Sequence, residues 1–316
     1  MSLWQGKQLA LAMDATALGD RFVVLAISVV YRGCAIPVIW TILPANVAGV
    51  WRPEWLRMLR LIKPAIPKSM TVIVLADRGL YARWLFKRIV DLGWHPFLRI
   101  NNSGKFRPEG KHDAHDFRSF VPQTGTAWSG KGTAFANTKN AGRRLNCTLL
   151  ACWQEGYKDP WLILTDLPPE AANAGWYGLR SWIEQGFKIT KRAGWQWQST
   201  RMSDPARASR LWLAVSVATL WLLSVGGESD QTIAEATFLD LTSTLAADKR
   251  SRKQTQLRLV SVFRRGWTLI LVALINHSQL PRSYFLPQPW PQSPIPNQQF
   301  LPHSVSKNEG GKSIAA

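Results

Sequence analysis

The sequence feature that most constrains the fold is a continuous hydrophobic run, residues 71–76, that ends in Asp77. A strand has such a run when both faces of its sheet are covered, as in a parallel sheet. A helical stretch, residues 80–92, and a second strand, residues 95–100, come next. This order predicts a βαβ unit in an α/β fold, with Asp77 at the carboxyl end of a strand. Open α/β sheets usually bind ligands at that edge.

Three more strands are predicted before this unit. An apolar segment, residues 8–16, ends with an acid, Asp14. Runs rich in valine and isoleucine follow at 21–31 and 35–43, with short turns between them. Taken alone, an aspartate at a strand end is more often a turn residue or a helix cap than a ligand. Asp14 and Asp77 therefore become functional candidates only in combination with a third element.

The third element is an amphipathic helix predicted at residues 176–192. At about 100° per residue, its apolar side chains fall on one stripe that would pack against the core. A narrow polar stripe beside it contains Tyr177, Arg180, Glu184 and Lys191. A carboxylate between two cations and a phenol suits a metal ion that grips a phosphodiester. The helix therefore indicates nucleic-acid chemistry.

These four residues also resemble a known family. Tyrosine, two residues, arginine, three residues, glutamate, six residues and lysine is the signature of a large group of bacterial insertion-sequence transposases. These are DDE enzymes, which bind two metal ions through an Asp-Asp-Glu triad. The resemblance implies that Asp14, Asp77 and Glu184 are this catalytic and metal-binding triad. It also implies that DNA phosphates are bound by three further side chains, Tyr177, Arg180 and Lys191.

A fold follows from the same resemblance, which covers about residues 8–225. It is the ribonuclease H-like α/β fold, a mixed sheet flanked by helices with a β-rich insertion before the last catalytic helix. Asp14 and Asp77 would lie on adjacent central strands. Glu184 would reach toward them from a covering helix.

The resemblance further implies the cofactor and the reaction. The triad would hold two Mg²⁺ ions, with Mn²⁺ as a substitute, since hard divalent cations prefer oxygen ligands. Two such ions about 4 Å apart can clamp a phosphodiester. The expected enzyme is a metal-dependent endonuclease and strand transferase. It would cut DNA at transposon ends and join the ends to target DNA, which is DNA-mediated transposition.

Composition divides the chain into four expected regions. Residues 1–100 would form the first part of the catalytic domain, and residues 101–175 would form the β-rich insertion. Residues 176–278 would carry the catalytic helix and the closing C-terminal helices. The tail, residues 279–316, is rich in proline, glutamine and serine and is expected to be disordered.

Short apolar runs give more detail within these regions. The insertion is expected to have antiparallel strands at 117–121, 147–153 and 161–164. A buried helix at 211–225 would close the core, and it is shorter than the about 20 residues that a membrane span needs. No targeting segment is visible at the amino terminus. We therefore expect a cytoplasmic protein without a membrane partner.

The charge of the chain agrees with a polyanionic partner. Its formal net charge is +19 and its sequence pI is about 10.4. Lysines and arginines that displace condensed counterions drive binding to double-stranded DNA, so association with the bacterial nucleoid is expected. A basic cluster within residues 249–265 is as compatible with a solvated helix face as with a DNA-backbone contact.

Other side chains leave alternatives open. Trp195 and Trp197 are either core residues, which is the commoner role, or platforms for unpaired bases. Cys147 and Cys152 are five residues apart in a predicted strand, which places them on opposite faces and argues against a shared zinc. Residues 112–116 hold two histidines and two aspartates without further ligands nearby, which favours a loop over a metal site.

Three functions remain compatible with these motifs. The family usually has a helical DNA-binding region before the first catalytic strand, which here begins within about the first ten residues. We therefore expect a catalytic part without its end-recognition part. The alternatives to a transposase are a ribonuclease H-like nuclease without strand transfer and a truncated DNA-binding remnant that regulates intact transposase. Paired-end chemistry would favour a homodimer.

Overall fold

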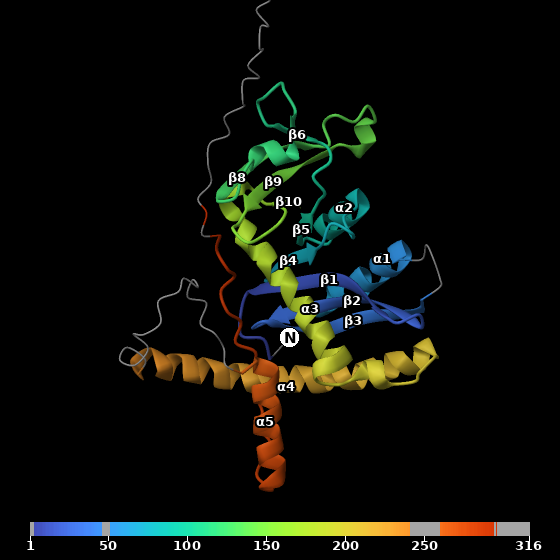
Figure 1. Cartoon of the computed structure of the whole chain (residues 1–316), viewed down its shortest axis with the longest axis vertical. Helices are drawn as coiled ribbons and strands as arrows, with labels where there is room; N and C mark the ends of the chain where they lie inside the picture. The colour runs from blue at the N-terminus through green and yellow to red at the C-terminus, as the bar shows by residue number, and fades with distance from the viewer. Residues whose placement is uncertain (1–2, 46–50, 241–259, 294, 296–316) are drawn as a thin grey trace, which may run out of the picture.

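The computed structural model describes residues 3–45, 51–240, 260–293 and 295. A ten-stranded mixed sheet forms the centre of this part of the chain, in the order β3-β2-β1-β4-β5-β10-β9-β8-β6-β7 (Figure 1). Helices lie on both sides of its amino-terminal half. The predicted fold class, a ribonuclease H-like mixed sheet flanked by helices, is confirmed.

The amino-terminal half of the sheet contains the predicted strands. They are β1 (Gln8–Leu18), β2 (Phe22–Tyr31), β3 (Cys34–Pro44), β4 (Thr71–Ala76) and β5 (His95–Arg99). β1 pairs antiparallel with β2 and parallel with β4, and β4 pairs parallel with β5. Across the sheet, the pairing therefore changes from antiparallel to parallel at β1. This change makes β1 and β4 neighbours at the centre of the sheet.

Alternating side chains give the sheet two covered faces. Leu9 belongs to a core cluster that includes side chains of α1 (Trp51–Ile62) and α2 (Arg83–Asp91). Ala10, on the opposite face, belongs to a second cluster that includes side chains of α3 (Ser181–Lys188). Every second residue of β1 thus faces α3.

Asp14 is not at the end of its strand, as the sequence suggested. β1 continues for four residues beyond it, because β2 pairs with β1 as far as Leu18 and Phe22. Gly19, with φ of +58°, then allows the tight turn between the two strands. Asp14 is therefore held within the antiparallel ladder, with Ala26 on β2 as its direct partner.

The insertion extends the same sheet. Its strands are β6 (Lys105–Pro108), β7 (His115–Asp116), β8 (Thr126–Ala134), β9 (Leu145–Trp153) and β10 (Trp161–Thr165). β10 pairs antiparallel with β5, and β9 pairs antiparallel with both β8 and β10. The strands predicted at 147–153 and 161–164 are confirmed by β9 and β10.

The strand predicted at 117–121 is wrong, because this segment forms a 3-10 helix, Phe117–Phe120. With three residues per turn, both of its phenylalanines point to the same side. There they contact Phe106 on β6, with ring centroids 6.3 Å and 5.8 Å apart. Burial of two aromatic rings on one side thus outweighs the strand pattern.

Two long helices lie below the sheet in Figure 1, and their axes cross there. They are α4 (Pro205–Asp240) and α5 (Val262–Ile275). α4 is longer than the helix predicted at 211–225, and it is only partly buried. Trp212 and Leu223 lie in the core, whereas the Leu213 side chain faces solvent.

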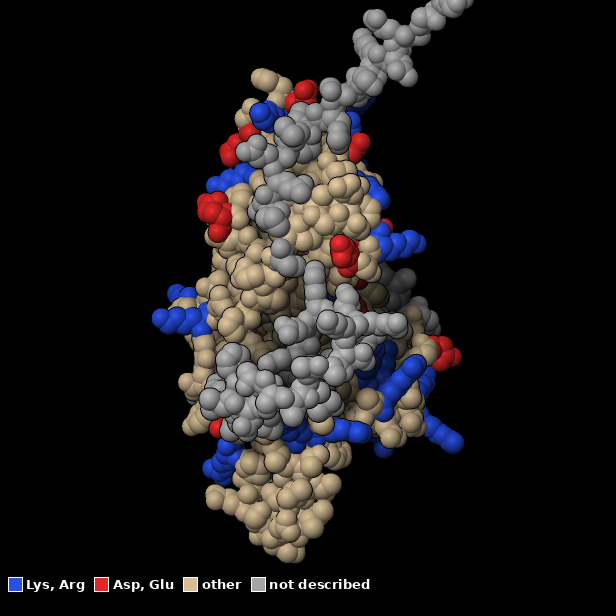
Figure 2. Space-filling view, turned by 60° about the vertical axis from the view of Figure 1, so that its left-hand side comes forward, with Lys and Arg blue, Asp and Glu red and all other residues tan. Residues whose placement is uncertain are grey.

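In the described part of the chain, α4 is the single helix long and apolar enough to cross a membrane, and 44% of its most apolar part is buried. Core helices of soluble proteins can have the same length and composition. The end of α5 projects from the molecule and is uncharged, while lysines and arginines gather above it (Figure 2).

The tail is predicted to be disordered from residue 279 onward, but residues 279–293 make defined contacts with the rest of the chain. Phe285 forms a β-bridge with Trp4, and Trp290 is buried against Trp176 at a ring distance of 4.8 Å. These aromatic contacts outweigh the polar composition of the segment. The prediction of disorder for residues 296–316 lies outside the described residues.

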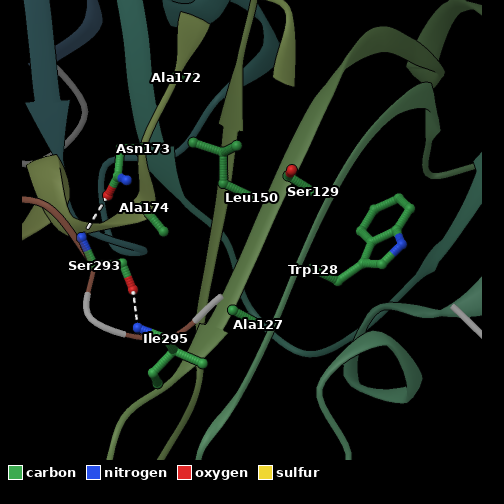
Figure 3. A pocket seen from close by; sticks show the side chains of 9 residues that line it. All are labelled: Ala127, Trp128, Ser129, Leu150, Ala172, Asn173, Ala174, Ser293 and Ile295. Carbon is green, nitrogen blue, oxygen red and sulfur yellow. Dashed lines mark hydrogen bonds between the residues drawn. The ribbon is translucent and has the colours of Figure 1, made fainter. Parts of the chain in front are cut away.

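A cavity of about 210 Å³ lies where this tail meets the insertion. Asn173 and Ser293 line it together with side chains of β8 and β9, and the Asn173 Oδ1 atom accepts a hydrogen bond from the Ser293 amide at 2.8 Å (Figure 3). None of the sequence-predicted site residues lines this cavity. The hydrogen bond between Ser293 and Asn173 holds the tail beside the segment that leads into α3.

The crossing of α4 and α5 gives a stability prediction. A Cβ atom at Gly266 would lie 1.9 Å from the Leu222 carbonyl oxygen, so Gly266→Ala should force the helices apart. We expect a loss of roughly 2 kcal/mol or more in the free energy of unfolding, measured by urea denaturation. Gly178→Ala is the control, because its nearest neighbour would be 3.7 Å away. Equal stability of the two variants would contradict this packing.

Candidate active site

The two predicted aspartates lie side by side on the sheet. Met13 pairs with Ala76 in the parallel ladder of β1 and β4, so the next residues, Asp14 and Asp77, are neighbours. Ala10 and Leu75 belong to the cluster that includes α3 side chains. Asp14 is four residues after Ala10, and Asp77 is two residues after Leu75, so each aspartate points to the same face of the sheet as that cluster. Strand periodicity therefore points both carboxylates toward the helix that carries Glu184.

The segment around Glu184 is not one continuous α-helix, as predicted for 176–192. It is a 3-10 helix, Ala174–Arg180, followed by α3 and then by a π-helical turn, Ile189–Ala193. Asn173 caps the first part, because its Oδ1 atom accepts the Gly175 amide at 2.7 Å.

The widened last turn has a specific cause. The amides of Gly194 and Trp195 both donate to the carbonyl oxygen of Ile189 at 3.0 Å, in place of the regular α-helical bonds. The four signature residues do not share one exposed stripe. Tyr177 and Arg180 are buried, Lys191 is half-buried and Glu184 is exposed.

Arg180 joins the three acids. One terminal nitrogen, Nη2, donates to Asp14 Oδ2 at 2.8 Å and to Asp77 Oδ2 at 3.4 Å. The other, Nη1, donates to Glu184 Oε1. The structure thus brings the three predicted catalytic residues together around a single guanidinium.

Burial sets the electrostatics of this cluster. It raises the pKa of Asp14 to about 6, while the charge of Arg180 and a hydrogen bond from the Ala15 amide oppose the rise. Burial also disfavours the charge on Arg180, but the nearby acids, Asp14 first, raise its pKa overall. Arg180 is therefore the cation that allows three carboxylates to share a partly buried site.

Residues 26–221 match the model of the family described as transposase DDE domain, which is more than half of the chain. The chain belongs to this transposase family. Asp77 and Glu184 fall inside the matched residues, and Asp14 precedes them. A search of curated proteins finds no match to the chain.

The remaining signature residues occupy different environments in this transposase-family chain. Burial raises the pKa of Tyr177 to about 12, and the charges of Arg180 and Arg99 oppose the rise. Its ring packs edge-on against Trp161 at 5.4 Å. Burial lowers the pKa of Lys191, with a further contribution from the charge of Arg192. Tyr177 is therefore an internal residue, whereas Lys191 lies at the surface of its turn.

The donor chemistry of the site fits divalent metal ions. Three carboxylates converge on one positively charged group, and carboxylate oxygens are the ligands that Mg²⁺ and Mn²⁺ prefer. No three histidine, cysteine or acidic side chains in the described chain are already arranged around a shared metal position. The Arg180 guanidinium lies between the carboxylates where positive charge is needed.

The other candidates from the sequence do not join this site. Trp197 is fully buried and stacks on Phe22 at 6.1 Å, and Trp195 donates its ring N–H to Thr219. Cys147 and Cys152 are buried free thiols on β9. Most of the basic cluster in 249–265 lies outside the described residues.

Sequence reasoning missed Arg99, the last residue of β5. It interacts with Tyr177 and donates from Nη2 to the Pro160 carbonyl oxygen at 3.2 Å. The register of the two strands places Arg99 beside Asp77, because Ala76 pairs with Leu98, and no sequence pattern gave that register.

The raised pKa of Asp14 predicts a pH effect on stability. The folded chain binds this proton with a pKa of about 6, against 3.8 as the ordinary value, so ionisation opposes folding. As pH rises from about 3 to 7, through both pKa values, the wild type should lose about 3 kcal/mol relative to Asp14→Asn.

Urea unfolding with a chelator present, repeated at several pH values, measures this difference. Asp20→Asn, which changes an exposed acid in the turn after β1, is the matched control and should run parallel to the wild type. A constant offset between wild type and Asp14→Asn at every pH would refute the prediction.

Proposed function

We propose that this chain is a DNA transposase that cleaves transposon ends and joins them to target DNA in a reaction that depends on divalent metal ions. The observation that carries the proposal is the convergence of Asp14, Asp77 and Glu184 on one guanidinium at the centre of the sheet. Membership of the transposase DDE domain family supports the reaction class.

The three acids would hold the metal ions. Two bound ions would supply an activated water and charge stabilisation at the leaving oxygen. Asp14 lies within β1 and Asp77 directly follows β4, so both would present oxygens at the centre of the sheet. Glu184 is more exposed, and its helix lets it approach the substrate from the side.

The signature cations would act on the DNA backbone. Arg180 has the planar pair of donors that binds phosphate in two places, and it already lies among the carboxylates. Lys191 is on the turn after α3 and would contact the backbone farther from the reacting atoms. Tyr177, predicted to bind phosphate through its hydroxyl, is buried, so it is better suited to hold the neighbouring arginines.

The proposal includes a division of labour along the chain. Residues 1–100 and 176–278 would form the catalytic unit, and residues 101–175 would cover the site and touch the transposon end. Double-stranded DNA would be the partner, with two copies of the chain bringing two ends together. Such a protein would act in the cytoplasm, on the bacterial nucleoid.

Removal of one carboxylate tests the proposal. Asp77→Asn and Glu184→Gln should each reduce Mg²⁺-dependent cleavage of the flanking inverted-repeat DNA by about a hundredfold or more, because each removes a metal ligand. Binding of Mn²⁺, followed by electron paramagnetic resonance, should weaken in parallel. Asp91→Asn, on the exposed end of α2, is the matched control and should change neither.

The products of the same assay separate the alternatives. Joined products lost in Glu184→Gln would establish a transposase. Cleavage without joining would indicate a ribonuclease H-like nuclease. Cleavage that persists at the wild-type rate in both variants would overturn the site, and DNA binding without any cleavage would point to a regulatory remnant.

A further inference from the structure

A basic side chain continues the row of acids across the sheet. Ala76 pairs with Leu98 in the parallel ladder of β4 and β5, so Arg99 lies directly beside Asp77, as Asp77 lies beside Asp14. Phe97 belongs to the cluster that includes α3 side chains, and Arg99, two residues later, points to the same face of the sheet. Neighbouring strands are about 4.8 Å apart. One strand of DNA can therefore touch the acids and Arg99 together.

The surroundings hold Arg99 without neutralising it. Its Nη2 atom donates to the Pro160 carbonyl oxygen at 3.2 Å, and it interacts with the buried phenol of Tyr177 by charge and by a hydrogen bond. Within the described residues, no carboxylate lies within salt-bridge distance of Arg99; Asp159 pairs with Arg78. Both of its contacts are with neutral oxygens.

The contrast with Arg180 is informative. Arg180 is buried and donates to three carboxylates, so its charge is balanced inside the protein. Arg99 is half-buried and keeps its charge available at the same edge. A guanidinium has five donors in a rigid plane, and its two contacts leave donors free for a phosphate oxygen pair.

We propose that Arg99 binds a DNA phosphate next to the carboxylate cluster, and that Tyr177 is the positioning residue for its guanidinium. This assignment rests on the proposed function, because it places DNA over the row of Asp14 and Asp77. It also gives the buried Tyr177 a role that needs no direct contact with DNA.

Salt-dependent DNA binding tests Arg99 apart from cleavage. A fluorescently labelled random-sequence duplex is titrated, without metal, with wild type, Arg99→Gln and Arg99→Lys. Arg99→Gln should bind about tenfold more weakly, as expected for the loss of a charged hydrogen bond. The slope of log affinity against log salt should shrink by about 0.9, which corresponds to one phosphate contact. Arg99→Lys should restore the slope but not the full affinity.

Two further variants complete the test. Tyr177→Phe keeps the Arg99 charge, so it should weaken binding and leave the salt slope unchanged. Arg57→Gln changes an exposed arginine that pairs with Glu54 on α1, and it should alter neither quantity. Wild-type affinity and slope in Arg99→Gln would overturn the proposal. So would a lowered melting temperature with an unchanged slope, because Arg99 would then only tie β5 to Pro160.

The DNA-binding test of Arg99 does not depend on whether Asp14, Asp77 and Glu184 are catalytic. Persistent cleavage by Asp77→Asn would overturn the proposed function, while the salt slope of Arg99→Gln would still decide whether Arg99 binds phosphate.

Discussion

The arrangement of the site depends on the Arg180 guanidinium. It contacts carboxylates from β1, from the residue after β4 and from α3, three segments that are far apart in the sequence. Three acids in a partly buried space repel one another, and burial already raises the pKa of Asp14 to about 6. A single planar cation with several donors satisfies all of them. It thereby ties the signature segment to the sheet.

The same carboxylates that bind Arg180 are the proposed ligands of the metal ions. Metal ions and Arg180 would satisfy the same carboxylate oxygens, and both bring positive charge to one place. On the proposed function, ions bound by Asp14 and Asp77 would release donors of Arg180 toward a phosphate. Arg99, which makes no ion pair among the described residues, would face phosphate without any such exchange. The two arginines thus differ in what surrounds them rather than in chemistry.

Much of this site could be predicted from the sequence because it depends on periodicity. Strand alternation and the order of elements place Asp14 beside Asp77, and the spacing of the signature brings Glu184 to them. Finer features depend on contacts that no local pattern reveals. The continuation of β1 past Asp14 depends on pairing with β2, and the π-helical turn depends on two amides sharing the Ile189 carbonyl. The ordered tail likewise depends on Trp290 packing against Trp176, which lies more than a hundred residues away.

The insertion is joined to the site by strand pairing and by side-chain contacts. β10 adds to the edge of β5, so residues 101–175 continue the sheet that carries Asp14 instead of forming a separate layer. Two of its residues reach the row of site residues: Trp161 packs against Tyr177, and the Pro160 carbonyl holds Arg99. Hydrogen-bonded strands resist sliding past one another, because a shift of one residue would move every side chain to the opposite face. Pairing with β4 on one side and with β10 on the other fixes the position of Arg99 relative to Asp77, and the proposed phosphate-binding row requires such a fixed spacing.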